Sequence, residues 1–278
     1  MALAPDPPRR LVVNADDFGR SHSINLAVIQ AHQQGVLTSA SLMVNEAASD
    51  EAVELAHANP RLGVGLHLTL LCGRSALKPT EIPGLVNDHC QFSDSPVAAG
   101  LRYFFSTNLR RQLRHEIEGQ FQKFQNTGLP LDHVNGHLNI HLHPTILGLL
   151  CSRDASWQIR HLRVTSDRFW LNSHIARGRW FYRISHAAIF NLLSCYARPI
   201  LSKRGIRHTR AVFGLLENGQ VHEDYILRLL HRLPGGDSEL YSHPSFDEFR
   251  HEFDALVSVR VRDTIRQLGI QLVRYQDL

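Results

Sequence analysis

Short apolar segments alternate with longer amphipathic segments along most of the chain. Segments rich in β-branched and other apolar residues predict strands near residues 11–14, 39–44, 62–70, 131–135, 161–165, 211–215, 239–241 and 271–275. Most of the intervening sequence has helical spacing, and serines at 21 and 23 or an asparagine at 108 can cap the helices that follow them. Strands that alternate with helices predict parallel βαβ units, and about seven such units favour a distorted (β/α) barrel.

Two stretches depart from this alternation. Residues 71–106 contain proline, glycine and aspartate at short intervals, so we expect a loop with little regular structure there. Residues 167–210 are basic and aromatic, and we interpret them as a segment inserted into the barrel. The prediction is therefore one domain over residues 1–278 with one insertion at about 167–210.

Composition excludes several classes of protein. With 43% hydrophobic and 20% charged residues in 278, the chain can bury a substantial core. No window approaches the roughly 18 apolar residues of a membrane span, and the first ten residues lack the apolar core of a signal peptide. The cysteines at 72, 90, 151 and 195 are too far apart for a CxxC module. We expect a cytoplasmic protein whose cysteines are reduced.

The positive charge is concentrated in one part of the chain. Residues 153–210 carry 12 Lys/Arg and two acidic residues, a net charge of +10. The remainder carries 18 basic and 24 acidic residues, or −6, so the two parts sum to the +4 of the whole chain. A nucleic-acid-binding domain is expected to spread its basic residues more evenly, so we expect no nucleic-acid partner.

Polar residues of the kinds found in metal sites occur in or after the first and third predicted strands. Asp16 and Asp17 follow the first strand, where one carboxylate can bind a metal ion while the other moves a proton. Taken alone, such a pair is also typical of a turn or a helix cap. His67 lies within the apolar sequence GVGLHLTL, where a buried imidazole must be hydrogen-bonded or bound to a metal. A hydrogen-bonded core histidine is the alternative for this residue.

Histidines gather after two later strands. Four of the 18 histidines fall within eleven residues after the strand near 131–135: His133, His137, His141 and His143. His243 follows the strand near 239–241. Neutral imidazole is the commonest metal ligand among side chains. Because the carboxyl ends of parallel strands share one face of a barrel, these histidines and the aspartate pair are expected to converge there. One carboxylate with two histidines leaves positions open for water and substrate, so we predict a catalytic metal site.

The same residues carry a family resemblance. Four ordered motifs resemble the YdjC-like (ChbG-type) family of carbohydrate deacetylases: residues 14–19 (NADDFG), 65–67 (GLH), 132–144 and 243–244 (HP). Within that family, the chain most resembles members associated with hopanoid biosynthesis (HpnK type), through residues 100–105 (GLRYFF), 110–113 (RRQL) and 127–135 (TGLPLDHVN).

The resemblance implies a polysaccharide-deacetylase-like barrel that removes an acetyl group from an amino sugar with one divalent metal ion. It implies Asp17, His67 and His137 as the metal ligands and Asp16 as the general base. By analogy with polysaccharide deacetylases, His243 would be the general acid. The ligand set accommodates Zn²⁺, and Mg²⁺, Mn²⁺ or Co²⁺ are compatible with it. Five further residues are predicted to bind substrate or to support the ligands: Asn14, Asn45, Asn135, His141 and His143. For the last two, a purely structural role is the alternative.

The hopanoid-associated members imply a lipid substrate, an N-acetylglucosaminyl hopanoid converted to glucosaminyl hopanoid and acetate. A soluble chitooligosaccharide deacetylase is the alternative, followed by a metal-dependent phosphoesterase. A glycosidase would place two catalytic carboxylates at facing strand ends, where this chain offers histidine. Relatives suggest a homodimer.

The inserted segment is expected to contact a membrane. It carries Arg177, Arg179 and Arg183 among aromatic residues, a pattern typical of segments that rest on anionic lipid. We therefore expect a cytoplasmic enzyme that associates peripherally with the inner membrane. A solvated helical flap or a dimer contact is the alternative.

Overall fold

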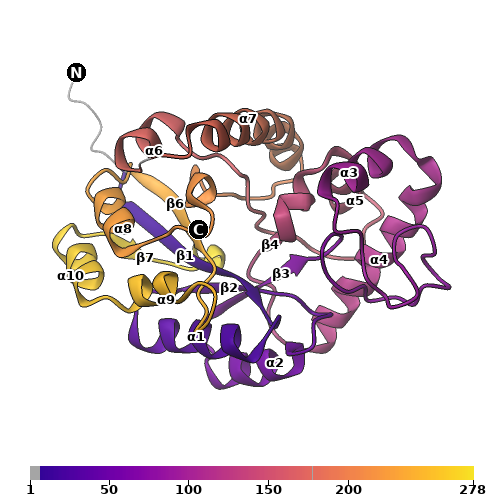
Figure 1. The fold of residues 1–278 in the computed structure, drawn as a ribbon, viewed down its shortest axis with the longest axis horizontal. Coiled ribbons are helices and arrows are strands. Elements are labelled where there is room, and N and C mark those ends of the chain that lie inside the picture. The colour runs from indigo at the N-terminus through magenta and orange to yellow at the C-terminus, as the bar shows by residue number, and fades with distance from the viewer. Residues whose placement is uncertain (1–6, 177) are drawn as a thin grey trace.

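Parallel strands form the centre of the molecule (Figure 1). The computed structural model describes residues 7–176 and 178–278, and within these residues seven strands form one sheet. The order across the sheet is β4-β3-β2-β1-β6-β5, with β7 paired to β1, and every pairing is parallel. The strands are β1 (Arg9–Phe18), β2 (Ser39–Leu42), β3 (Gly63–Leu68), β4 (Val134–Gly136), β5 (Ala211–Phe213), β6 (Gly236–Ser242) and β7 (Gln271–Leu272).

An extended segment spans the gap between the two edge strands of this sheet. Leu162 bridges to Val134 of β4, and His161 bridges to Arg207, which precedes β5; both bridges are parallel. The strand predicted over 161–165 is therefore reduced to isolated bridges. The curled sheet and this segment together make the distorted barrel, and the predicted parallel α/β fold of about seven strands is confirmed.

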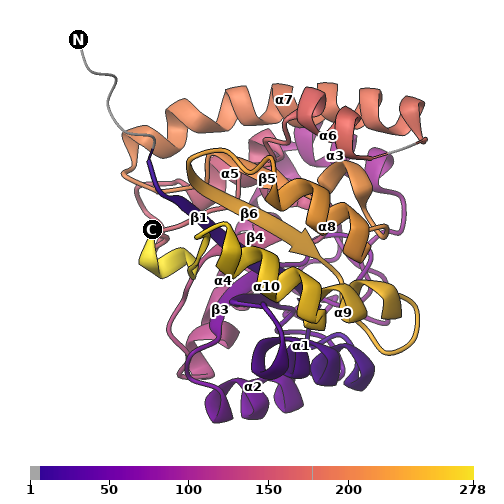
Figure 2. The same cartoon turned by 90° about the vertical axis from the view of Figure 1, so that its left-hand side faces the viewer.

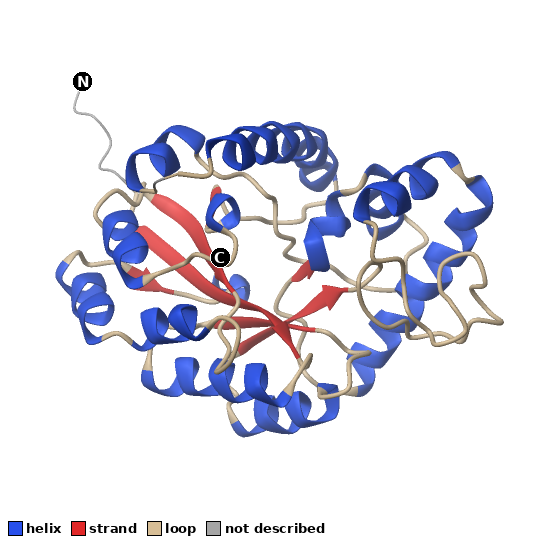
Figure 3. Ribbon diagram, viewed as in Figure 1, coloured by secondary structure: helices blue, strands red, loops and turns tan. Residues whose placement is uncertain are grey.

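Helices surround the strands on the outside (Figure 3). They are α1 (His22–Gln34), α2 (Ser49–Ala58), α3 (Pro96–Phe105), α4 (Thr107–Asn126), α5 (Pro144–Leu150), α6 (Phe169–Ile175), α7 (Trp180–Lys203), α8 (Glu223–Leu230), α9 (Arg250–Val257) and α10 (Val259–Gln267). Ser21 caps α1 by accepting a hydrogen bond from the Ile24 backbone, as its position predicts. Short 3-10 helices are η1 (His137–Leu142), η2 (Leu215–Glu217) and η3 (Tyr275–Asp277).

Helix α3 corrects the prediction that residues 71–106 form only a loop. Pro96 stands in its first turn, and tertiary contacts hold the helix in place. Tyr103 is buried and donates its hydroxyl hydrogen to the Leu70 carbonyl at 2.9 Å, while Ala99 packs into the apolar core. The sequence between β6 and β7 forms two helices, because Ser258 interrupts the helical segment and caps α10 through the Val261 backbone.

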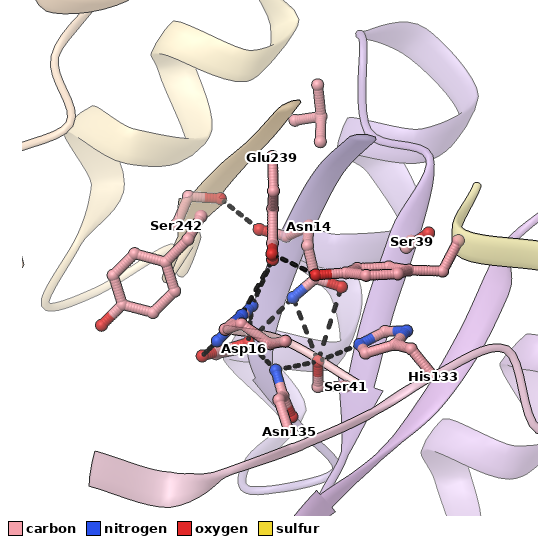
Figure 4. A network of polar contacts seen from close by, with 12 residues as sticks. Asn14, Asp16, Ser39, Ser41, His133, Asn135, Glu239 and Ser242 are labelled. Atoms are coloured by element: carbon pink, nitrogen blue, oxygen red, sulfur yellow. Dashed lines mark hydrogen bonds and ion pairs between the residues drawn. The ribbon is translucent and has the colours of Figure 1, made fainter. Parts of the chain in front are cut away.

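The two faces of the sheet differ in polarity. Along β1, Leu11, Val13 and Ala15 belong to the large apolar core. The alternating residues Asn14 and Asp16 point to the opposite face, where they join a buried network of polar side chains (Figure 4). Side chains alternate between faces along a strand, so the polar face is the interior of the barrel. The candidate site lies at the carboxyl end of this interior face.

The segment predicted as an insertion contains α6 and α7 (Figure 2). Arg183, expected to face a membrane, is instead fully buried, and its guanidinium pairs with Glu217 of η2 at 2.6 Å. This buried ion pair attaches α7 to the segment that follows β5. Arg177, the neighbouring residue predicted to contact lipid, lies outside the described residues. No described helix, α7 included, has both the length and the hydropathy that crossing a membrane demands.

Candidate metal and catalytic site

The three residues predicted as metal ligands lie together at the carboxyl edge of the sheet. Asp17 lies near the end of β1, His67 near the end of β3, and His137 directly after β4. One ligand atom from each lies within 4.8 Å of the others, and all three residues are buried. Asp17 Oδ1 is 3.0 Å from His137 Nδ1 and 3.3 Å from His67 Nε2. One carboxylate and two imidazoles at this spacing can hold a divalent metal ion.

The backbone is unusual at one of these three residues and directly after another. Asp17 has φ = 64°, and Leu138 and Asn139, which follow His137, have φ = 53° and 58°. Such left-handed conformations are uncommon for residues other than glycine and persist where surrounding contacts fix them. At Asp17, one contact is a 2.8 Å ion pair from Arg20 to Oδ2, which leaves Oδ1 facing the two imidazoles.

Asn135 sets the orientation of the His67 ring. Its Oδ1 lies 2.7 Å from His67 Nδ1, and its Nδ2 donates to Asp16 Oδ1 at 3.0 Å. Since the amide oxygen can only accept, His67 Nδ1 carries the hydrogen in this pair. Nε2 is then left with its lone pair directed toward Asp17. A partner of this kind is common around metal-bound histidines because it fixes the tautomer that can bind the ion.

Asp16 is held as a carboxylate by a buried arginine. Arg163 donates from Nη1 to Asp16 Oδ2 at 2.6 Å and from Nη2 to Oδ1 at 2.9 Å. Burial opposes ionisation of Asp16, but the charge of Arg163 outweighs it and holds the pKa of the carboxyl below its ordinary value. Asp16 is thus available as an acceptor of protons beside the three candidate ligands.

A second carboxylate shares this arginine. Arg163 is fully buried and also donates to Glu239 Oε1, from Nε at 3.0 Å and from Nη2 at 2.5 Å. The Tyr275 hydroxyl donates to the other oxygen of Glu239, and the Tyr241 ring lies 5.0 Å from the guanidinium carbon. The guanidinium therefore has a charged partner on each side and an aromatic ring against it.

His243 faces the same cavity as the two aspartates. A cavity of about 470 Å³ is lined by Asp16, Asp17, Arg20 and His243, among others. The His243 ring packs edge-on against Tyr241, with 4.7 Å between ring centroids, and its backbone N–H donates to Glu252 at 2.6 Å. Asp16 and His243 are thereby placed at one opening, where both can reach a bound substrate.

The remaining predicted residues lie in different surroundings. Asn14 donates to Asp16 Oδ1 at 2.8 Å, so it supports the carboxylate rather than an imidazole. Asn45 donates to the Arg74 carbonyl and lines a cavity with residues of α2 and α4 instead of the one at Asp16. His141 and His143 pair through Nε2 with the carbonyls of Arg163 and Gly100. Burial lowers the pKa of His141 to about 3, so it is neutral.

Arg163 and Glu239 are members of the site that the sequence analysis did not identify. A signal existed for both. Arg163 lies in the apolar run HLRVT and Glu239 in the predicted strand near 239–241, so each is a charged residue inside a buried strand. A charge in that position requires a partner, by the same argument that singled out His67.

Comparisons with known proteins show which family this chain resembles. The YdjC-like protein family model matches residues 10–267. The chain is 38% identical over 150 residues to a carbohydrate deacetylase of Brevibacillus brevis, covering 54% of this chain and 57% of that protein. It is 39% identical over 140 residues to a carbohydrate deacetylase of Geobacillus stearothermophilus, covering 50% and 53%. The aligned region thus spans little more than half of either relative.

A solved structure is similar over almost the whole chain. It is a protein from Enterococcus faecalis V583 described as a candidate cellobiose-phosphate cleavage protein, with a TM-score of 0.74 and 23% identity. The superposition covers 97% of this chain and 98% of that one, which shows a shared fold. Since the family model extends over nearly all of the described residues, this chain belongs to the YdjC-like protein family.

Proposed function

We propose that this protein is a metal-dependent N-deacetylase that hydrolyses the acetamide of an N-acetylglucosamine moiety. The observation that carries the proposal is the placement of an ionised, arginine-paired Asp16 beside the group Asp17, His67 and His137, with His243 on the same cavity. The carbohydrate deacetylases to which the chain is similar support the same reaction.

The described residues have separate tasks in this proposal. Asp17, His67 and His137 would hold the divalent ion, for which Zn²⁺ suits the ligand set and Mg²⁺, Mn²⁺ or Co²⁺ are alternatives. When bound, the ion would polarise the acetamide carbonyl and lower the pKa of a water molecule. Asp16 takes the proton of the attacking water, since Arg163 keeps it ionised. His243 gives a proton to the departing amine, which otherwise leaves poorly.

Replacement of Asp16 with asparagine tests this assignment. We expect acetate release from an N-acetylglucosaminyl substrate to fall by about 10²- to 10⁴-fold, the usual contribution of a positioned general base. Zinc affinity should remain close to that of the parent protein, because Asp16 is not among the three candidate ligands. Free acetate and bound zinc are measured on the same samples. Full activity in Asp16→Asn would remove Asp16 from the mechanism.

We further propose a lipid-borne substrate, an N-acetylglucosaminyl hopanoid, presented at an anionic membrane. The support is the exposed face of α7, which carries Trp180, Phe181 (87% exposed) and Leu192 (72% exposed). Residues 184–197 contain no Asp, Glu, Lys or Arg, whereas exposed basic residues flank this stretch at Arg179, Arg198, Lys203 and Arg204. An apolar face with basic flanks matches the apolar interior and the anionic surface of a bilayer.

The first turn of α7 lies near the carboxyl edge of the sheet. Arg179 and Arg183 attach the first turn of α7 to Asn218 and Glu217, which follow β5 at the carboxyl edge of the sheet. Figure 2 shows α7 running back along the molecule, opposite in direction to β6, with its first turn on the side where the β6 arrow ends. A membrane under α7 would therefore bring a lipid headgroup to the edge of the sheet that carries Asp16 and Asp17.

Vesicle sedimentation tests the lipid proposal. We expect the parent protein to sediment with anionic vesicles, and Phe181→Ser with Leu192→Ser to weaken this binding severalfold. Val259→Ser, which removes an exposed apolar side chain from α10, serves as the control and should bind as the parent does. Acetate release should favour the hopanoid substrate over chitooligosaccharides. Faster release from chitooligosaccharides, or self-association through α7 without vesicle binding, would contradict the proposal.

A further inference from the structure

A continuous chain of buried hydrogen bonds leads from His67 to Asp132, which lies beside the amino ends of β2 and β3. His67 Nδ1 lies 2.7 Å from Asn135 Oδ1, and Asn135 Nδ2 lies 2.8 Å from Ser41 Oγ. Ser41 Oγ in turn lies 2.9 Å from His133 Nε2, and His133 Nδ1 lies 3.0 Å from Asp132 Oδ2. Figure 4 shows this network, in which Ser41 lies between Asn135 and His133. All five residues are at most 1% exposed.

The direction of every bond in this chain follows from Asp132. Burial opposes ionisation of Asp132, but hydrogen bonds from His133, from Ser39 and from the Gln276 backbone keep its pKa below the ordinary value. The carboxylate can only accept, so His133 carries a hydrogen on Nδ1, and the neutral ring then presents a lone pair at Nε2. The Ser41 hydroxyl can donate to His133 Nε2 at 2.9 Å or to Asn14 Oδ1 at 3.4 Å, and the shorter distance favours His133.

Donation by Ser41 fixes the orientation of the side-chain amides of Asn14 and Asn135. With its hydrogen committed to His133, Ser41 Oγ is free to accept from Asn14 Nδ2 at 3.0 Å and from Asn135 Nδ2 at 2.8 Å. Both amide nitrogens also donate to Asp16 Oδ1. The oxygen of Asn135 is thereby turned toward His67. The chain thus determines both the hydrogen bonds on Asp16 and the tautomer of His67.

Ser41, His133 and Asp132 have the connectivity of a serine–histidine–aspartate nucleophile triad, but they cannot act as one. The Ser41 hydroxyl is fully buried and already receives two amide donors. Among the described residues, Ser41 is not one of those that line the cavity at Asp16. The triad geometry therefore serves to support other groups and not to attack a substrate.

Two glycines of β3 make room for this support. A Cβ on Gly65 would lie 2.5 Å from the His133 ring, and a Cβ on Gly63 would lie 2.7 Å from the Asp132 carboxylate. Any larger residue at either position would displace the pair. The His133 ring is also stacked on Tyr275, with 4.5 Å between ring centroids. The strand and the ring together hold the His133–Asp132 pair in one place.

We propose that Asp132, His133 and Ser41 are positioning residues that hold His67 in the tautomer whose Nε2 can bind a metal ion, while fixing both amide donors on Asp16. This inference rests on the proposed metal centre at Asp17, His67 and His137. It assigns His133 a role in metal affinity, although His133 does not bind the metal ion itself.

Zinc titration of matched variants tests the proposal. In Ser41→Ala and in His133→Phe, which keeps a ring against Tyr275, we expect zinc affinity to fall about 10- to 100-fold, as on loss of other partners of ligand histidines. Ser41→Thr restores the hydroxyl and should recover most of the affinity. Ser238→Ala removes a buried hydroxyl of β6 that has no hydrogen-bond partner among the described residues, and should bind zinc as the parent does.

The outcomes separate this inference from the proposed function. Folded Ser41→Ala or His133→Phe protein with unchanged zinc affinity overturns the role of the chain and leaves the metal centre standing. Equal losses in Ser41→Ala and Ser41→Thr also overturn it, because packing rather than the hydroxyl would then be responsible. A parent protein that does not bind zinc, cobalt, manganese or magnesium overturns the metal centre and the chain together. If Ser41→Ala does not fold, the affinity of His133→Phe decides.

Discussion

Zinc binding and acetate release are both expected to disappear when Asp17 is replaced with asparagine. The Oδ1 atom of Asp17 faces both imidazoles and is the one anionic atom in the candidate ligand group. Asparagine has almost the same shape and tolerates the left-handed backbone of this position, φ = 64°, so the fold should survive. Affinity should fall by more than the roughly 100-fold that loss of an outer partner costs. Calorimetric titration with zinc measures the change.

A neighbouring aspartate provides the matched control for this variant. Asp247 lines the same cavity but lies outside the three-residue group, and its side chain is exposed. Asp247→Asn should therefore retain zinc affinity. Zinc affinity in Asp17→Asn within about tenfold of the parent would show that the ion, if it binds, is held elsewhere.

Replacement of Arg163 with methionine is expected to destabilise the fold severely. The side chain is fully buried between Asp16 and Glu239, and its removal leaves both carboxylates without their cationic partner. Breaking a buried ion pair from one side typically costs about 3–5 kcal/mol in the free energy of unfolding. Urea denaturation measures this loss. Arg266→Met, which breaks a 3.6 Å exposed pair with Asp263, should cost at most about 1 kcal/mol.

The pH dependence of unfolding provides a second check on Arg163. The pKa of Asp16 is lowered in the folded protein from its ordinary value of 3.8, so its ionisation stabilises the fold above that pH. This contribution is lost as the pH falls from 3.8 through the lower folded pKa. Burial without Arg163 would raise the pKa of the unpaired carboxylates in Arg163→Met, so acidification neutralises them above pH 3.8. The stability difference between parent and variant should therefore begin to narrow above pH 3.8 and continue to narrow below it. If parent and Arg163→Met differ little in free energy of unfolding at pH 7, or if their difference grows on acidification, the role of the ion pair is contradicted.

The candidate ligands were predictable from sequence because each carries a local signal. Asp16 and Asp17 follow an apolar strand, and His67 interrupts one, so each violates the pattern of its own segment. Parallel topology then places such positions at one edge of the sheet without any knowledge of packing. Most of the order of strands and helices was predictable for the same reason, since it depends on segments read one at a time.

The supporting contacts were not predictable in this way. Arg163 and Asp16 are separated by 147 positions, and neither sequence neighbourhood specifies the other as partner. Helix α3 was missed although Pro96 stands in its first turn, and its residues Tyr103 and Ala99 pack against distant elements. The burial of Arg183 likewise depends on its ion pair with Glu217. The sequence of its own segment therefore could not show which arginines are exposed and which is buried. Local pattern identifies unusual residues, whereas tertiary structure selects their partners.

The 3-10 helix η3 supplies contacts to the buried polar network that form late during synthesis of the chain. Tyr275 stacks on His133 and donates its hydroxyl hydrogen to Glu239, and the Gln276 backbone N–H donates to Asp132. These supports come from residues more than 250 positions after Asp16 and Asp17. A nascent chain that has already formed β1 to β6 would still lack them, leaving Glu239 and Asp132 short of donors. The hydrogen bonds that η3 gives to Glu239 and Asp132 can therefore form only after residue 276 has emerged from the ribosome.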